Sequence, residues 1–340
     1  MRRHLSAVIL LLSAVLSCQE QNEQNVEHFT LDSFEATLLD SLSATRIDCC
    51  PDLLQPMHMR LAENGSIAIA DIAQTQGMLL TFDQNTGRTK YAVTKGRGPE
   101  EMLTIFQLAS KDSSLWVSCP SDRRVVRLSC NSSETFEMKD YFFKILPFRD
   151  SLFIALSGGF TGNRLDLRNP SGETLETFGT FPKLKNSPKL PPDNALFQSD
   201  ITVSPDSRHI AVMCFDFEYV DIYDSSLNLT HRLSGPEGYE QEATLRNDSG
   251  YSVYVVNPGK AIFSNIVSDD NQFAVGYIGQ KDGDTGYNRI STILIFDWDG
   301  NPLKSYNLDL DLMSFDIDWE NDILYGLVAA DEPYILKWQL

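Results

Sequence analysis

The stretch Val220-Asp-Ile-Tyr-Asp224, which runs on through a polar turn to Asn228, decides the fold that this sequence predicts. An apolar strand ends in an acid, turn-forming residues follow, and a second strand begins. The same unit recurs at Leu80–Gly87, Leu165–Gly172 and Ile293–Gly300. Asp and Asn start such turns by binding their own backbone, and glycine supplies the positive φ that closes them. The repeated unit predicts a chain built from β-hairpins.

Short apolar-rich segments follow one another from about residue 60 onward, separated by Asp, Asn, Gly and Ser clusters. They show almost no sustained helical period, which is typical of an all-β protein. The segments that we expect to be strands are Ser66–Ala70, Met78–Phe82, Leu115–Ser118, Val125–Leu128, Leu152–Leu156, Ile210–Cys214, Tyr219–Tyr223, Phe273–Tyr277, Ile293–Phe296 and Ile323–Val328.

The spacing of the turn units predicts a six-bladed β-propeller of four-stranded antiparallel blades over residues 28–340. The units begin 55 to 85 residues apart, so insertions are present, and the mature chain has room for about six four-stranded blades of roughly 50 residues each. A pair of β-sandwiches is the weaker alternative, because a sandwich would not return to the same unit along the whole chain. We expect residues 28–45 to complete the last blade beside Tyr334–Gln339. Alternatively, Phe34, Leu38, Leu39 and Leu42 mark a short amphipathic helix.

The N-terminus has the pattern of an export signal. Arg2 and Arg3 precede an apolar run from Leu5 to Leu16, which as a helix would reach roughly 18 Å, well short of the roughly 30 Å hydrocarbon core of a membrane. Residues 1–17 are therefore interpreted as a signal peptide. Val15-Leu-Ser-Cys18 looks like a lipobox, so we expect lipid attachment at Cys18 and a flexible polar tether over residues 18–27. The alternative is ordinary cleavage that leaves Cys18 as a thiol.

The charge balance restricts the partners. The chain has 47 acidic and 28 basic residues, a net charge of −19. Removal of Arg2 and Arg3 with the signal peptide would make the mature chain still more negative. We therefore expect no nucleic-acid partner, and membrane attachment only through the lipid anchor.

The cysteines predict no disulfide framework. Five remain after Cys18, an odd number. If residues 120–123 form a hairpin turn, Cys119 lies opposite Arg124 and cannot bridge to Cys130. The adjacent Cys49 and Cys50 are interpreted as packed thiols, and a zinc site is disfavoured.

One segment goes beyond generic pattern: Lys95-Gly-Arg-Gly-Pro-Glu-Glu-Met102. It resembles the Gly-x-Gly-Pro-(Gly/Glu)-Glu-Phe element of six-bladed, TolB-like propeller lipoproteins, with Met102 where an aromatic residue is usual. Echoes occur at Ser234-Gly-Pro-Glu-Gly-Tyr239 and Phe178-Gly-Thr-Phe-Pro182. Together with the lipobox and the repeated units, the resemblance spans nearly the whole chain.

In such a propeller these segments cross the face of the disc from one blade to the next, and Gly and Pro shape the crossing. One interpretation is that they are connectors and nothing more. The other is that the crossings line the mouth of an axial pocket. Arg97, Glu100, Glu237 and Tyr239 would then meet a ligand there.

The sequence offers no catalytic motif. His28, His58, His209 and His231 stand in no recognisable pattern, and no Gly-x-Ser-x-Gly nucleophile elbow is present. The segment Ser204-Pro-Asp-Ser207 is interpreted as a turn that opens a strand. We therefore predict no catalytic residues and no enzyme.

The acidic residues predict no metal site and no cofactor. Asp309 with Asp311, and Asp316 with Asp318, would each share one face of a strand, which we expect to be solvent-exposed. The loop Asp282–Gly286 lacks the third acid and the terminal Glu of an EF-hand, so we expect a mobile hairpin loop rather than a calcium site.

These observations favour an exported, lipid-anchored cell-envelope protein, at an outer membrane on its periplasmic or surface side. We expect a monomer that binds or scaffolds an envelope protein, peptide or glycan, because strands hold propeller loops rigidly. A metal-dependent propeller hydrolase or lactonase is the alternative, since a fold by itself does not define chemistry. An envelope sensor or assembly factor would differ only in its partner.

Overall fold

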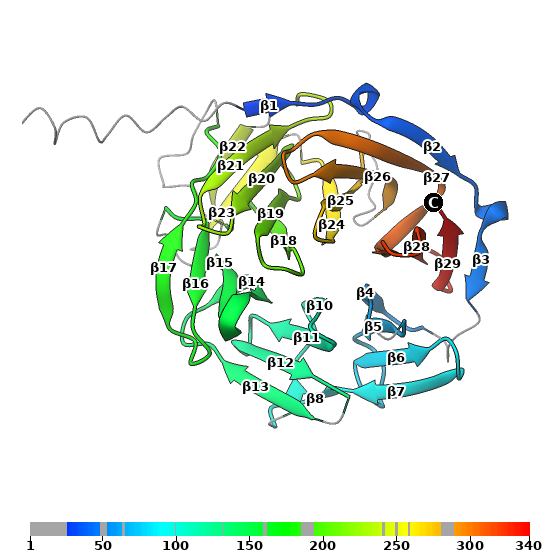
Figure 1. The fold of residues 1–340 in the computed structure, drawn as a ribbon. Coiled ribbons are helices and arrows are strands. Elements are labelled where there is room, and N and C mark those ends of the chain that lie inside the picture. The colour runs from blue at the N-terminus through cyan, green and yellow to red at the C-terminus, as the bar shows by residue number, and fades with distance from the viewer. Residues whose placement is uncertain are drawn as a thin grey trace, which may run out of the picture.

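In the computed structural model, β-sheets stand side by side in a ring around a central axis (Figure 1). The structure describes residues 26–47, 53–62, 65–98, 100–130, 132–158, 162–184, 194–239, 242–248, 251–257, 259–279 and 289–340. The prediction of an all-β propeller is confirmed. The expected signal peptide, Cys18, the pair Cys49 and Cys50, and the loop Asp282–Gly286 lie outside the described residues.

Three sheets each contain four antiparallel strands that follow one another in the chain. The first holds β4 (Pro56–Leu61), β5 (Ile67–Asp71), β6 (Leu79–Asp83) and β7 (Arg88–Ala92). The second holds β10 (Gln107–Lys111), β11 (Ser114–Cys119), β12 (Arg124–Leu128) and β13 (Ser133–Glu137). The third holds β14 (Phe142–Pro147), β15 (Phe153–Ser157), β16 (Leu165–Arg168) and β17 (Thr174–Phe178).

Two larger sheets complete the ring. One has the order β1-β21-β20-β19-β18 and holds β18 (Ser199–Val203), β19 (His209–Cys214), β20 (Tyr219–Asp224), β21 (Leu229–Ser234) and β1 (Val26–His28). The other holds β24 (Phe263–Ser268), β25 (Gln272–Tyr277), β26 (Ile290–Asp297), β27 (Pro302–Asp318), β28 (Ile323–Val328), β29 (Tyr334–Gln339), β3 (Thr45–Ile47) and, beside β27, β2 (Glu35–Leu39).

The long strand β27 joins two parts of this eight-stranded sheet. Its first part, up to Asn307, pairs mainly with β26, and its second part, from Leu312, pairs with β28. The strand thus leaves the outer edge of one four-stranded unit, β24 to β27, and enters the next, β27 to β29 with β3, at its inner edge (Figure 1).

The N-terminal segment corrects the expectation for residues 28–45. Only β3, which starts at Thr45, pairs with β29 and extends the last unit. Strands β1 and β2 instead run parallel along the outer edges of β21 and β27. Single 3₁₀ turns at Leu31–Ser33 and Ser41–Ser43 replace the alternative amphipathic helix. Parallel pairing at an edge leaves no periodic signal in one short segment, which explains the error.

The first strand also begins inside the expected tether. Val26 and Glu27 were assigned to the flexible segment 18–27, but they pair with Arg232 and Leu233. The rest of that segment lies outside the described residues.

The four turn units lie where the sequence places them. Each joins the third strand of a sheet to the strand outside it, as in β6 to β7 and β20 to β21. Asp83, Asp224 and Asp297 each accept a backbone N–H two residues further on, at 2.9, 2.8 and 3.0 Å. Gly87 and Gly300 close two of the turns with φ of 66° and 81°. Each of the ten predicted strands coincides with an observed strand, with ends that differ by three residues at most.

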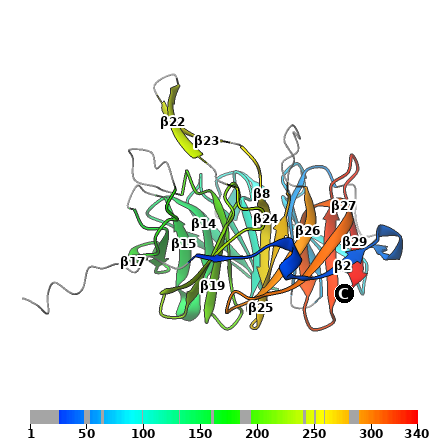
Figure 2. The ribbon, with the colours of Figure 1, turned by 90° about the horizontal axis from the view of Figure 1, so that it is seen from above.

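Two small two-stranded sheets lie on one face of the ring. Strands β8 (Thr94–Lys95) and β9 (Glu101–Met102) pair in parallel within the predicted crossing element. Strands β22 (Glu242–Asp248) and β23 (Tyr251–Asn257) form a hairpin that stands off the disc (Figure 2). It lies between β21 and β24, so it belongs to the face on which the chain passes from one sheet to the next.

The core lies between neighbouring sheets. In one cluster, Phe29 and Phe34 from the N-terminal segment pack edge-on against Phe296, each with ring centroids 5.1 Å apart.

The predicted register at Cys119 is confirmed, because Cys119 pairs with Arg124. Cys119, Cys130 and Cys214 are free thiols.

Candidate functional site

Two cavities lie on the axis of the ring, one toward each face. The crossing face is the one on which the outer strand of each sheet leads to the next sheet, and it also carries the β22–β23 hairpin. The opposite face holds the turns between the third and fourth strands of the sheets, and we call it the hairpin face. The crossing-face cavity has a volume of about 290 Å³ and the hairpin-face cavity about 240 Å³.

Every innermost strand contributes to the crossing-face cavity at or next to its first residues. Because six strands from separate parts of the chain converge there, a ligand in this cavity would contact the whole ring. The contributing residues include His58 from β4, Phe106 before β10, Lys144 from β14, Asp200 from β18, Ser264 from β24 and Met313 from β27.

Lys144 and Asp200 form an ion pair in the wall of this cavity. The Lys144 Nζ lies 3.7 Å from the Asp200 Oδ1, and both side chains are at most 10% exposed. Lys144 also donates to the Phe106 carbonyl at 3.2 Å and lies 4.7 Å from the centre of the Phe106 ring. Asp200 accepts the backbone N–H of Ile201 at 3.0 Å. The two charges therefore largely satisfy each other.

His58 is held neutral beside this pair. Its pKa is lowered to about 3, chiefly by burial and then by the positive charge of Lys144, against a smaller opposing effect of Asp200. A neutral imidazole presents one donor and one acceptor, so His58 can orient a polar ligand without adding charge.

Asp216 is the exception among the charged groups of this cavity. It follows β19 and is partly buried, and no residue in the described part of the chain donates a hydrogen bond or an ion pair to its carboxylate. Burial alone raises its pKa. An acid in a cavity wall without a partner is a group that a ligand can satisfy.

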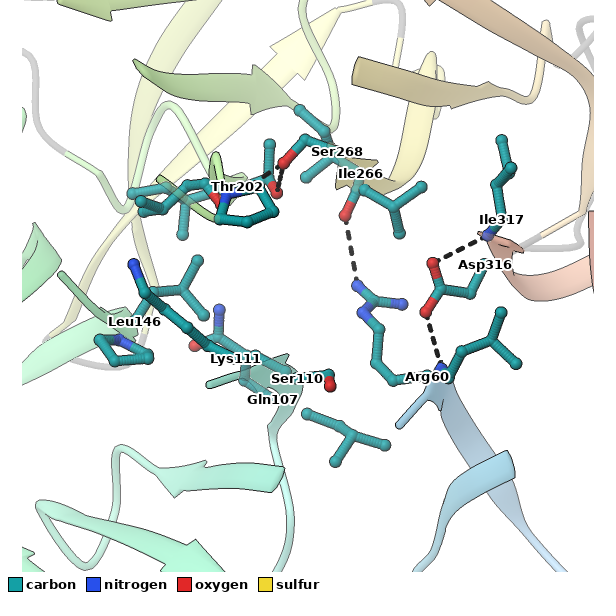
Figure 3. Close-up of a pocket in the computed structure, with 18 of the residues that line it drawn as sticks. Arg60, Gln107, Ser110, Lys111, Leu146, Thr202, Ile266, Ser268, Asp316 and Ile317 are labelled. Atoms are coloured by element: carbon teal, nitrogen blue, oxygen red, sulfur yellow. Dashed lines mark hydrogen bonds between the residues drawn. The ribbon is translucent and has the colours of Figure 1, made fainter. Parts of the chain in front are cut away.

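The hairpin-face cavity is built around Arg60 (Figure 3). Its guanidinium donates to the Asn265 Oδ1 at 3.0 Å and to the Ile266 carbonyl at 3.3 Å. Lys111 lines the same cavity and donates to the Ser207 hydroxyl. The cation at the centre is thus held by neutral oxygens.

Asp316 lines the hairpin-face cavity and corrects an expectation. We predicted a solvent-exposed face for Asp316 and Asp318, but Asp316 is 8% exposed. It accepts the backbone N–H groups of Leu61 and Ile317 at 2.7 and 2.8 Å (Figure 3). The alternation was interpreted correctly as one face, but that face of β27 points to the axis, where the strand is innermost.

The predicted ligand residues Arg97 and Glu100 lie toward the outside of the second sheet. Both are exposed, and Glu100 accepts a hydrogen bond from Ser133 on the outermost strand. The crossing element itself is fastened by its own acid, since Glu101 Oε2 accepts the N–H of Gly98 at 2.7 Å. A Cβ on Gly96 would overlap this carboxylate, so a larger residue there would displace the Glu101 side chain.

The other two predicted residues, Glu237 and Tyr239, are brought together. The Glu237 carboxylate accepts hydrogen bonds from the hydroxyls of Tyr239 and Tyr277. Glu218 fastens this crossing by accepting the N–H groups of Glu237 and Tyr239 at 2.9 and 2.8 Å. Neither pair is among the described residues that line the two cavities.

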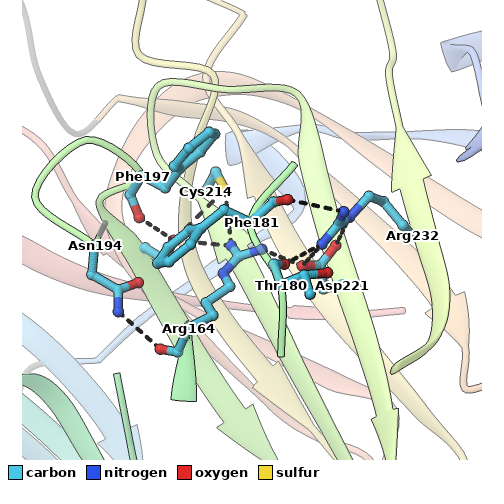
Figure 4. Close-up of polar contacts among 9 residues, drawn as sticks. Arg164, Thr180, Phe181, Asn194, Phe197, Cys214, Asp221 and Arg232 are labelled. Atoms are coloured by element: carbon cyan, nitrogen blue, oxygen red, sulfur yellow. Dashed lines mark hydrogen bonds and ion pairs between the residues drawn. The ribbon is translucent and has the colours of Figure 1, made fainter. Parts of the chain in front are cut away.

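A second buried group of charges lies where the third and fourth sheets meet (Figure 4). Asp221 on β20 pairs with Arg164, just before β16, and with Arg232 on β21, whose Nε is 2.7 Å away. Arg164 also donates to the Ser199 hydroxyl at 3.1 Å and to the Cys214 sulfur at 2.9 Å. We call Arg164, Asp221, Arg232, Ser199 and Cys214 the interface cluster. Its charged side chains are at most 5% exposed, so its role is structural.

The axial residues escaped sequence analysis because they form no local motif. His58, Lys144, Asp200 and Asp216 come from three different sheets, and each lies in or just after a short strand with no recognisable pattern around it. What these residues share is their place in or beside strands that occupy corresponding positions in successive sheets.

The described residues offer no metal site or membrane helix. Within them, no group of three or more His, Cys, Asp or Glu could hold a metal ion. None of the helices in that same part of the chain has the length and apolarity needed to cross a membrane.

Solved structures share the fold at low sequence identity. A protein described as exported, from Bacteroides fragilis NCTC 9343, is similar with a TM-score of 0.55 and 11% identity, over 92% of this chain and 98% of that one. A catalytically inactive variant of virginiamycin B lyase from Staphylococcus aureus, solved with quinupristin, is similar with a TM-score of 0.50 and 10% identity, over 87% of this chain and 99% of that one.

No curated protein matches the chain. A family model described as TolB-like 6-blade propeller-like matches residues 44–320. This range begins just before β3 and ends just after β27, so it includes strands of every sheet in the ring and the walls of both cavities, while β1, β2, β28 and β29 lie outside it. The chain therefore belongs to the TolB-like 6-blade propeller-like family.

Proposed function

We propose that this protein is a non-catalytic binding module whose ligand enters the crossing-face cavity. The observation that carries the proposal is the convergence of all the innermost strands on one cavity of about 290 Å³, which combines apolar walls with a few polar groups. Such a cavity is the usual form of a small-ligand site. The described wall contains a neutral His58 and a Lys144–Asp200 pair.

The blade count belongs to the same proposal. If β27 divides the eight-stranded sheet into two units, the ring has six blades, in agreement with the family description. Each blade then presents one innermost strand to the axis.

A partner larger than the cavity would meet the crossings around it. Arg97, Glu100, Glu237 and Tyr239 all lie on crossings, and the β22–β23 hairpin rises from the same face (Figure 2). An envelope protein, peptide or glycan that inserts one group into the cavity would spread over this face, and it would reach Arg97 and Glu100 only if it extends to the outermost strand β13.

The rest of the proposal comes from the sequence. The N-terminal pattern supports export by residues 1–17 and a lipid on Cys18, which would attach the protein to an envelope membrane. The proposal places it at the outer membrane, as a monomer. The metal-dependent hydrolase or lactonase has no observation in its favour among the described residues.

Site-specific photo-crosslinking in the native host tests the proposal. Phe106 lies in the cavity wall and is 46% exposed, so a photo-reactive phenylalanine analogue at this position should capture a ligand. Leu175 is 55% exposed on the outer strand β17 and serves as the matched control. A reproducible adduct at position 106 and none at 175 is expected. Equal capture at both positions, or a tightly bound divalent metal in the purified protein, would contradict a non-catalytic axial site.

A further inference from the structure

We propose that the crossing-face cavity binds an organic ammonium group on an apolar stem, with Asp216 as its counter-ion. This inference rests on the proposed binding function and names the chemical class of the ligand.

The charges of the residues that line the described wall favour a cation as the ligand. Lys144 and Asp200 lie 3.7 Å apart and neutralise each other, and His58 is neutral. Asp216 remains, with no ion pair or hydrogen bond from the described residues. The described wall therefore carries one uncompensated negative charge, which a ligand with one positive charge would balance.

The shape and lining of the cavity favour an organic cation over a metal ion. Phe215, Phe263, Ile105 and Met313 give the wall a largely apolar surface that suits a hydrocarbon stem. A divalent metal would need several oxygen or nitrogen ligands around it. Among the described residues, no group of three or more His, Cys, Asp or Glu side chains could hold such an ion.

An aromatic ring in the wall already accepts an ammonium group. The Lys144 Nζ lies 4.7 Å from the centre of the Phe106 ring, within the usual range for a cation–π contact. Phe215 precedes Asp216 in the chain and lines the same cavity. An ammonium group at Asp216 would thus have a carboxylate and an aromatic residue close together.

Anionic ligands fit less well. Lys144 would be their only cationic partner among the described lining residues, and it is engaged by Asp200 and by the Phe106 carbonyl. The charge of Asp216 would also repel an anion.

Calorimetric titration of the purified full chain tests the inference. The probes are hexylamine, for a free amine, and Nα-acetyl-lysine amide, for a lysine side chain of a peptide. Their uncharged counterparts are hexanol and Nα-acetyl-norleucine amide. We expect one amine probe to bind at least about tenfold more tightly than its counterpart, because a desolvated charge pair is strong. The amine probe that binds more tightly shows whether the natural ligand is a free amine or a lysine side chain of a peptide.

The decisive variant is Asp216→Asn, which should weaken amine binding about tenfold or more while the protein stays folded. Asp140→Asn is the matched control, since Asp140 is exposed on the crossing between β13 and β14. It should bind like the wild type. Equal binding of charged and uncharged probes, or full binding by D216N, would overturn the inference.

The two proposals fail separately. If the photo-reactive group at position 106 captures a ligand but no amine probe binds, the ammonium inference is wrong and the binding function stands. If position 106 captures nothing while amines bind in a manner that depends on Asp216, the inference holds for the chemistry of the cavity and the proposed partner is wrong.

Discussion

The interface cluster and the crossing-face cavity both bury charged groups, but they treat a carboxylate in opposite ways. Asp221 is fully buried and receives hydrogen bonds from Arg164 and Arg232. Asp216 is partly buried and receives none from the described residues. A charge that holds two sheets together is surrounded by partners, whereas a charge left open toward a cavity is available to something else. The difference separates structural ionic groups from candidate binding groups without any motif.

Breaking the interface cluster gives the largest expected effect. Asp221→Asn leaves two guanidinium groups, Arg164 and Arg232, buried without their shared anion. We expect a loss of about 3–5 kcal/mol in the free energy of unfolding, because an unpaired buried charge is strongly unfavourable. Urea denaturation followed by circular dichroism measures it. Asp224→Asn, at the exposed turn after the same strand, is the control and should cost well under half as much. A similar loss in both variants would show that the cluster is not the source.

The next largest effect is the loss of stability in acid that comes from His58 in the cavity wall. Its pKa is about 3 in the folded protein and near 6.5 when unfolded, chiefly because of burial. Both states are neutral above pH 6.5, so stability is fully present there. As the pH falls toward 3, the unfolded chain takes up the proton first and stability is lost, by up to about 1.4 kcal/mol for each pH unit.

His58→Gln should therefore lose less stability than the wild type between pH 6.5 and pH 5, by about 2 kcal/mol at most. Urea midpoints at several pH values measure the difference. His28→Gln, which changes an exposed histidine on β1, is the matched control. If the H58Q and wild-type profiles run parallel, His58 is not held neutral by its surroundings.

The sequence predicted the middle strands of the sheets, and the turns that follow them, better than the axis. Turn units such as Asp83–Gly87 carry their own chemistry, because an Asp oxygen caps the turn and a glycine closes it, so the strands that lead into them could be recognised. The burial of Asp316 depends on which part of β27 is innermost, and that follows only from the closed ring. The edge pairing of β1 and β2 likewise depends on surfaces made by residues about 200 or more positions away.

The axial site was missed for the same reason. Asp216 stands between two phenylalanines, and this local pattern resembles any strand end. Its meaning comes from Lys144 and Asp200, which neutralise each other and leave it without a partner. Glu237 and Tyr239, which the crossing motif indicates, do contact each other, on a crossing that Glu218 fastens.

Removing the charge of Asp216 gives the smallest expected change in the free energy of unfolding. The change is opposite in sign to that of Asp221→Asn. Burial raises the pKa of Asp216 in the folded state above its ordinary value of 3.8. As the pH rises past 3.8, the unfolded chain releases this proton first, and the folded protein loses stability until its own higher pKa is passed. The loss then persists at neutral pH. Asp216→Asn removes it, so we expect the free energy of unfolding at pH 7 to rise by about 1 kcal/mol or less.

Denaturation of the ligand-free protein at several pH values tests this sign. The gain from D216N should shrink as the pH falls toward 4, where the wild-type carboxyl takes up its proton, and D140N should show no gain at any pH. A variant that is more stable and yet binds amines less well would show that the fold tolerates an unfavourable charge for the sake of its ligand. A loss of stability in D216N would instead give Asp216 the same structural role as Asp221, and the contrast between the two regions would disappear.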